Sequence, residues 1–276
     1  PIEHIADVVL GHRAAVGLAA TVLAEPGLRS AWANALRHAS VEEAAERCRA
    51  AGAWVCVWGQ PGYPALLADD PLPPPVLFGR GDRSLLDGRR VAMVGTRNAT
   101  QGGRTAARSI AADLAIAGVH VVSGLARGID GAAHGGVLSA EGVGRPIGVV
   151  GSAVDVVYPR EHRNLWEAVS NCGVLLSEVP MGEGPSPWRF PMRNRIIAAL
   201  AEVVVVVESR EKGGSLITVT EALRRDVPVM AVPGGVGSRA SAGTNQLLRD
   251  GAAPVLDAGD VLALLQLDHS RSAPGA

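Results

Sequence analysis

The sequence predicts an α/β protein built on a doubly wound, mostly parallel sheet. Between residues 91 and 232, six short apolar runs alternate with segments of helix length. Runs that are apolar throughout are typical of strands buried on both faces. Their alternation with helices favours parallel strands joined by crossover helices. In such sheets, ligands bind beyond the carboxyl ends of the strands.

The predicted elements follow directly from these runs. Strands are expected at 91–94, 119–122, 147–150, 174–176, 203–207 and 229–232, with helices at 102–117, 128–141, 161–171 and 214–225. The core is therefore expected to occupy residues 84–267.

Two regions precede this core. Residues 1–53 show the apolar spacing of short amphipathic helices and predict a small helical N-terminal domain, which caps the sheet or contacts a partner. Residues 54–83 predict a linking segment, with a strand at Trp54–Trp58 and extended backbone at the proline-rich run 71–75. The tail 268–276 is expected to be disordered. Because the sequence begins at Pro1 rather than methionine, we expect a chain trimmed at its start.

The composition indicates where the protein is located in the cell, but it does not decide what the protein binds. No apolar run approaches the roughly 18 residues of a membrane helix, and no secretory signal is visible. Three scattered cysteines fit a reducing cytoplasm and are expected to be buried. The net charge of −1 is not that of a typical nucleic-acid binder. The basic residues other than Lys212 are all arginines, which suits phosphate contact but equally reflects a GC-rich genome.

The most informative motif is the segment from Phe190 to Ile197. Pro191 suits the start of a helix, where its missing N–H donor would have no partner anyway. Arg193, Asn194 and Arg195 are then expected in the first turn, where the helix dipole is already positive. Cations at that position favour an anionic ligand, and a phosphate is the natural candidate.

Other strand-end loops carry similar features. Arg97 follows Gly95 after the first predicted strand, where a guanidinium is well placed to clamp a phosphate. Gly213, Gly214 and Ser215 predict a backbone nest that opens a helix and can hold an anion.

Residues with catalytic or metal-binding chemistry are not marked out by the sequence. Asp130 and His134 either cap and stabilise the helix that they begin or belong to a binding site. Histidine and cysteine never fall at metal-ligand spacing, and no paired carboxylates stand out. We therefore expect a binding edge with no metal, no cofactor and no catalytic residues.

Six motifs in sequence order resemble the DNA processing protein A family (DprA/Smf). They are G-T-R at 95–97, S-G-L-A-R-G-I-D at 123–130, Y-P-R at 158–160, F-P-M-R-N-R-I-I at 190–197, G-S-L-I-T at 214–218 and G-T-N-Q-L-L at 243–248. The resemblance covers roughly residues 55–265. It implies an extended Rossmann-like core that binds single-stranded DNA, usually as a homodimer, and passes it to the recombinase RecA in natural transformation, without known chemical turnover.

The resemblance also implies a positive pocket. The DNA-binding residues expected from it and from the strand-end loops are Gly95, Arg97, Gly124, Arg127, Arg160, Phe190, Arg193, Asn194, Arg195, Lys212, Gly213, Gly214, Ser215 and Asn245. Phe190 is either a stacking platform for a base or an ordinary core side chain. Ala153 and Gly213 depart from the family's usual glycine and serine, and we expect no winged-helix module of the kind that some members carry.

Two other functions are possible in principle. Residues 233–238, P-G-G-V-G-S, resemble the phosphate loop of nucleoside-monophosphate phosphoribohydrolases. In those enzymes a glutamate follows this loop closely. In this sequence no acidic residue lies between Ser238 and Asp250, so the carboxylate that glycosidic cleavage needs is missing. A nucleotide-sensing scaffold would need a pocket of mononucleotide size. We therefore expect a DNA-binding protein rather than an enzyme.

Overall fold

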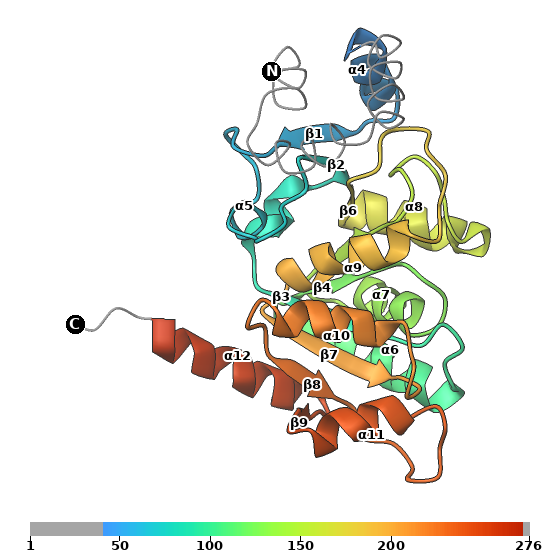
Figure 1. The fold of residues 1–276 in the computed structure, drawn as a ribbon, viewed down its shortest axis with the longest axis vertical. Helices are drawn as coiled ribbons and strands as arrows, with labels where there is room; N and C mark the ends of the chain where they lie inside the picture. The colour runs from blue at the N-terminus through green and yellow to red at the C-terminus, as the bar shows by residue number, and fades with distance from the viewer. Residues whose placement is uncertain (1–40, 273–276) are drawn as a thin grey trace, which may run out of the picture.

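The computed structural model describes residues 41–272, with side chains from 42 to 266, and contains one nine-stranded sheet flanked by helices (Figure 1). The strands lie in the order β1-β2-β6-β5-β4-β3-β7-β8-β9. Among these residues, the β1–β2 and β2–β6 pairings are antiparallel and the other six are parallel. The mostly parallel α/β sheet is thereby confirmed.

The elements have the following bounds. The strands are β1 (Trp54–Val57), β2 (Val76–Gly81), β3 (Arg90–Gly95), β4 (His120–Ser123), β5 (Pro146–Val149), β6 (Val174–Ser177), β7 (Val203–Glu208), β8 (Val229–Ala231) and β9 (Ala253–Pro254). The helices are α4 (Val41–Ala50), α5 (Ala65–Ala68), α6 (Gln101–Ile116), α7 (Ile129–Ser139), α8 (Arg163–Cys172), α9 (Arg189–Ala199), α10 (Ser215–Leu223), α11 (Ala242–Arg249) and α12 (Ala258–Ser272). Two short 3-10 helices are η1 (Arg83–Asp87) and η2 (Arg160–His162).

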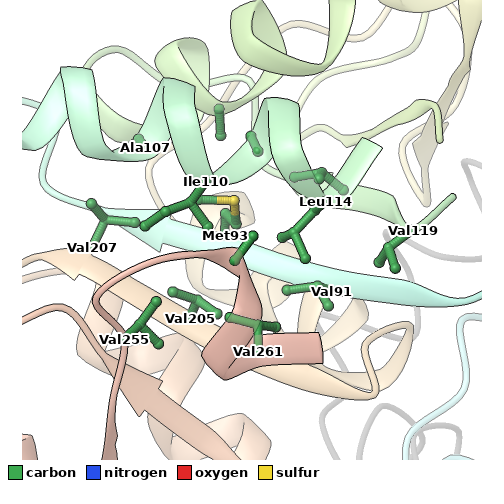
Figure 2. Close-up of a cluster of buried hydrophobic side chains, with 14 of the residues drawn as sticks. Val91, Met93, Ala107, Ile110, Leu114, Val119, Val205, Val207, Val255 and Val261 are labelled. Carbon is green, nitrogen blue, oxygen red and sulfur yellow. The ribbon is translucent and has the colours of Figure 1, made fainter. Parts of the chain in front are cut away.

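Both faces of the sheet are buried, as the continuous apolar runs predict. Side chains alternate along β3, so that Val91 and Met93 face α6 and α12 and pack against Leu114 and Val261 (Figure 2). Ala92 and the other intervening side chains join a second cluster beneath α9 and α10. This burial on two sides explains why the strands lack the polar alternation of a half-exposed sheet.

The segment 54–83 is part of the sheet and not merely a connection to it. Its strands β1 and β2 extend the sheet beyond β6, which corrects the prediction of a linking segment. A buried ion pair fixes the segment further, because the Arg225 Nε lies 2.6 Å from the Asp70 carboxylate. The prolines at 73–75 lead directly into β2.

The ends of the chain differ from the sequence analysis in two respects. Helix α12 continues to Ser272, so the residues from 268 to 272 are helical and not disordered. Of the predicted N-terminal helical domain, only α4 is described, and residues 1–40 and 273–276 lie outside the description. Cys48 and Cys56 are buried as expected, whereas Cys172 is exposed.

The strand order places a switch point between β3 and β7. From β3 the chain winds outward through β4, β5 and β6, and it later returns to β7 on the other side of β3 and continues through β8 and β9. The loops that leave β3 and β7 lead to α6 and α10, which pack on opposite faces. Such a divergence opens a crevice at the carboxyl ends of the two strands.

Candidate nucleic-acid interface

A cleft of about 630 Å³, here called the switch cleft, lies at this switch point. It is bounded by the end of β3, the first half of α9 and the start of α10. Its polar, aromatic and glycine lining consists of Gly95, Thr96, Arg97, Asn98, Asp130, Tyr158, Phe190, Arg193, Asn194, Arg210, Lys212, Gly213, Gly214, Ser215 and Thr218. Nine of the fourteen residues predicted to bind DNA therefore meet in one cleft.

Arg97 and Phe190 form the centre of this lining. The Arg97 guanidinium carbon lies 5.0 Å from the centroid of the Phe190 ring, within range of a cation–π contact. Tyr158 lies on the same ring, with its centroid 5.5 Å from that of Phe190. Phe190 is only half-buried, so it is not an ordinary core side chain. Arg97 is exposed, and it forms no ion pair with the described residues.

Arg193 is a buried residue in the wall of the switch cleft. It is 5% exposed, and its Nη1 donates to the carbonyls of Gly124, at 2.7 Å, and Val149. A Cβ at Gly124 would lie 2.6 Å from the Arg193 Cζ, so a glycine is required for the guanidinium to fit. Burial lowers the pKa of Arg193 to about 10, and the nearby carboxylate of Asp130 acts in the opposite direction.

The position of Arg193 corrects the helix-start argument. Helix α9 begins at Arg189, so Pro191 is its third residue and Arg193, Asn194 and Arg195 lie in the second turn. Carbonyl oxygens and Asp130 already compensate the charge of Arg193. An external anion is therefore not needed to explain this arginine, and Arg193 supports the cleft wall more than it presents a free charge.

Asp130 and His134 are both buried side chains of α7. The Asp130 carboxylate accepts hydrogen bonds from the backbone N–H groups of Gly124, at 3.1 Å, and Ala126, at 3.4 Å. Burial raises the pKa of Asp130, and Arg193 opposes that rise. Among the described residues, no hydrogen bond joins the Asp130 carboxylate to the His134 ring. Burial lowers the pKa of His134 to about 4, so the ring is neutral.

The start of α10 forms the opposite wall. Gly213, Gly214 and Ser215 precede and open the helix, as the nest prediction requires, and no side chain caps its N-terminus. Exposed Lys212 stands beside them, together with Arg210, which the sequence analysis missed. A helix N-terminus flanked by two cations attracts anions through both its dipole and its free N–H groups.

Three of the predicted residues lie away from the switch cleft. Arg195 is buried, pairs with Glu178 and donates to the Leu72 carbonyl at 2.9 Å, so it ties α9 to the segment 54–83. Asn245 bonds both the N–H and the carbonyl of Gly234 and holds the loop after β8 in place. Arg160 is exposed on η2 and, within the described chain, lines neither the switch cleft nor the two cavities beside it.

A second cleft of about 650 Å³, here called the helix cleft, lies beside the first. Its lining is Arg97, Asn98, Ala99, Arg104, Arg108, Arg127, Gly128, Gly131, Ala132 and His162. A recess of about 50 Å³ lies between the two clefts, and its walls include Arg97, Gly124, Arg127, Phe190 and Arg193. Gly124 and Arg127 are thus brought to the edge of the switch cleft. The sequence analysis did not include Arg104 and Arg108 among the candidate binding residues, although their spacing on a predicted helix placed them on one face.

The described part of the chain contains neither a candidate membrane span nor a candidate metal site. Residues 41–272 contain no helix that is long and apolar enough to cross a membrane. Within the same range, no three histidine, cysteine or acidic side chains are grouped as metal ligands.

The fold and the site define an α/β protein with a cleft lined by basic side chains at the switch point of its sheet. This chain belongs to the DNA recombination-mediator protein A family, whose profile matches residues 54–266. It is 42% identical to DNA processing protein DprA of Bacillus subtilis over 200 residues, which are 72% of this chain and 67% of that protein. It is 38% identical to DNA processing protein DprA of Streptococcus pneumoniae, over 73% of this chain and 70% of that protein.

Solved structures agree with this assignment. The crystal structure of DNA processing protein A from Streptococcus pneumoniae has a TM-score of 0.72 at 36% identity and covers 76% of this chain and 73% of that chain. A structural study of the single-stranded DNA binding mode of DNA processing protein A from Helicobacter pylori provides another match. That protein has a TM-score of 0.69 at 28% identity, over 78% of this chain and 96% of that chain. The chain spans only 52% of Protein Smf from Synechocystis, to which it is 40% identical.

Proposed function

We propose that this protein binds single-stranded DNA, with the sugar–phosphate backbone in the switch cleft. The observation that carries the proposal is the guanidinium of Arg97, which is exposed beside the ring of Phe190 and has no ion pair with any residue that the structure describes. A cation next to an accessible aromatic face suits a single strand, because phosphates bind the cation while an unstacked base lies on the ring. Duplex DNA would not offer a free base face for this contact.

The charges of the cleft support an anionic ligand. Its lining carries Arg97, Arg210 and Lys212 as exposed cations. Asp130 is the only carboxylate among the described lining residues, and it is occupied by Arg193 and two backbone donors. The net positive charge therefore concentrates at the sheet edge although the whole chain is close to neutral.

Binding without chemical turnover is the function that this lining supports. Hydrolysis of a nucleotide would need a second, accessible carboxylate or a nucleophile with an adjacent base. Asp130 is buried, and the neutral ring of His134 is fully buried, so neither group can reach a ligand in the cleft as a free acid or base. We therefore propose a binding protein and not a phosphoribohydrolase.

The partners are proposed from family membership. A DNA recombination mediator would protect single-stranded DNA and help to load the recombinase RecA in the cytoplasm during natural transformation. The homodimer implied by the family resemblance belongs to the same proposal, and light scattering after size exclusion tests it. RecA loading predicts faster assembly of RecA filaments on single strands already coated with a competing binding protein.

Fluorescence anisotropy of a labelled single-stranded oligonucleotide tests the DNA-binding proposal. We expect Arg97→Ala to lower the affinity for all sequences alike and to reduce the slope of log affinity against log salt by about 0.7, the value of one phosphate contact on a single strand. Arg249→Ala removes one charge from an exposed position on α11 and serves as the matched control. Equal affinity of the two variants would refute the placement of DNA in the switch cleft.

A further inference from the structure

The helix cleft gathers basic side chains that the switch cleft does not use. Arg104 and Arg108 come from α6, Arg127 from the loop before α7, and His162 from η2. None of the described lining residues of this cleft is acidic. Its volume of about 650 Å³ is similar to that of the switch cleft. A cavity of this size with a wholly basic charged lining suits an anionic ligand.

Two of these four basic side chains have no partner in the described protein. Arg104 and Arg108 are exposed, one helical turn apart, and form no hydrogen bond or ion pair through their side chains in the described chain. Like charges at this spacing repel each other. Arg127 pairs with Glu161, and His162 Nδ1 lies 2.9 Å from the Leu125 carbonyl, to which it donates. The fold therefore leaves two guanidiniums free at the mouth of the cleft.

Glycines on α7 leave room for these side chains. A Cβ at Gly135 would lie 3.1 Å from Arg108 Nη1, and one at Gly131 would lie 2.8 Å from His162 Cε1. Gly128 opens α7 with a φ of 76°, a conformation that glycine adopts at little cost. Glycines inside a helix weaken it, so their presence here is compensated by close approach of α6 and of the basic side chains.

The two clefts form one track. Arg97 and Asn98 line both of them, and Arg97 and Arg127 line the recess in between. A ligand that leaves the switch cleft past Arg97 therefore enters a helix cleft whose described lining has no acidic side chain, and the exposed Glu161 beside it is paired with Arg127. A polymer with a phosphate at every unit can occupy both clefts at once, whereas a mononucleotide can occupy only one.

We propose that the helix cleft is a second phosphate-binding subsite, which holds the backbone of the same DNA strand beyond Arg97 through Arg104 and Arg108. This inference rests on the proposed function and extends its footprint from the sheet edge onto α6. It predicts that affinity grows with oligonucleotide length until both clefts are filled.

The test compares thymidine oligonucleotides of about 5 and about 16 nucleotides by anisotropy, within the range of site sizes of single-strand binders. The variant is Arg104→Ala/Arg108→Ala, which keeps good helix formers on an exposed face and should fold normally, as circular dichroism checks. Arg47→Ala/Arg249→Ala removes two charges from exposed positions on α4 and α11 that line neither cleft and serves as the control.

For the long oligonucleotide, we expect the Arg104→Ala/Arg108→Ala variant to bind about 20-fold more weakly than the control at about 0.1 M salt. Each phosphate contact contributes about 0.7 to the slope of log affinity against log salt. Between about 1 M and about 0.1 M salt, one contact therefore raises the affinity about fivefold. The slope should fall by about 1.4. The short oligonucleotide, which fits in the switch cleft, should bind both variants equally.

Three results would overturn the inference. If the unmodified protein binds the long oligonucleotide tightly and the variant shows the same affinity and salt slope, the helix cleft is not a DNA-binding subsite. That result would leave the proposed function intact. Equal losses for short and long oligonucleotides would show that the cleft does not extend the footprint. If the Arg104→Ala/Arg108→Ala variant loses binding of thymidine monophosphate but keeps its affinity for both oligonucleotides, the helix cleft is a mononucleotide site. A failure of the unmodified protein to bind either oligonucleotide would instead refute the proposed function.

Discussion

The substitution Gly124→Ala tests how the wall of the switch cleft is built. Gly124 lies directly after β4, and the guanidinium of Arg193 occupies the space that a side chain would need. The added methyl group would lie 2.6 Å from the Arg193 Cζ, far inside van der Waals contact. The guanidinium therefore has to move.

The expected loss of stability follows from the bonds of Arg193. Its Nη1 donates to the carbonyls of Gly124 and Val149, and the whole side chain is buried. Hydrogen bonds of a charged donor contribute about 1.5–3 kcal/mol each. Displacement that breaks both would lower the free energy of unfolding by about 3–6 kcal/mol, and Asp130 would lose its compensating charge.

Urea unfolding followed by circular dichroism measures this loss. Gly102→Ala is the matched control, because a Cβ at Gly102 meets no atom closer than 3.9 Å and an alanine inside α6 should stabilise the protein by about 0.5–1 kcal/mol. The reasoning is refuted if Gly124→Ala unfolds within about 0.5 kcal/mol of the unmodified protein, a difference typical of neutral surface changes.

Three further predictions concern stacking, acid stability and the segment 54–83. Phe190→Ala should weaken single-strand binding by about 1–3 kcal/mol, whereas Phe190→Trp should retain it; equal affinities in a titration would contradict the stacking role. The pKa of His134 is about 4 in the folded protein and about 6.5 in an unfolded chain, so unfolding takes up a proton at acid pH. Stability should therefore fall by up to about 3 kcal/mol as the pH drops through this window, and a urea series should show that His134→Gln flattens the dependence. Asp70→Asn removes one of the two carboxylates that pair with buried Arg225, the other being Glu221, and should cost about 2 kcal/mol in urea unfolding, against less than about 0.5 for Glu46→Gln in an exposed pair; equal costs would contradict the tie between the segment 54–83 and Arg225.

The periodicity of the sequence was enough to predict the core of the fold. The six apolar runs predicted β3 to β8, because burial on two faces requires uninterrupted apolar residues. The strand expected at Trp54–Trp58 is β1, whereas β2 was not predicted. The proline run at 71–75 and the mixed polarity of 76–81 suit an edge strand as well as a loop, and only pairing with β6 decides between them.

The sequence predicted the edge of the sheet that carries the site but not how each arginine is used. Arg97, Arg193 and Arg195 look alike in their motifs, yet Arg97 is exposed, Arg193 is bonded to two carbonyls, and Arg195 pairs with Glu178. These differences depend on contacts between elements far apart in the chain. The meeting of the loops after β3 and β7 depends on strand order, which no local pattern encodes.

Photo-crosslinking of a thymidine oligonucleotide that carries 4-thiothymidine tests most directly that the switch cleft holds the DNA strand. A base stacked on Phe190 should crosslink within the peptide that contains Phe190 and Pro191, and Arg97→Ala should reduce this yield while the control Arg249→Ala leaves it unchanged. Crosslinks that map instead to α12, with none in α9, would contradict the account.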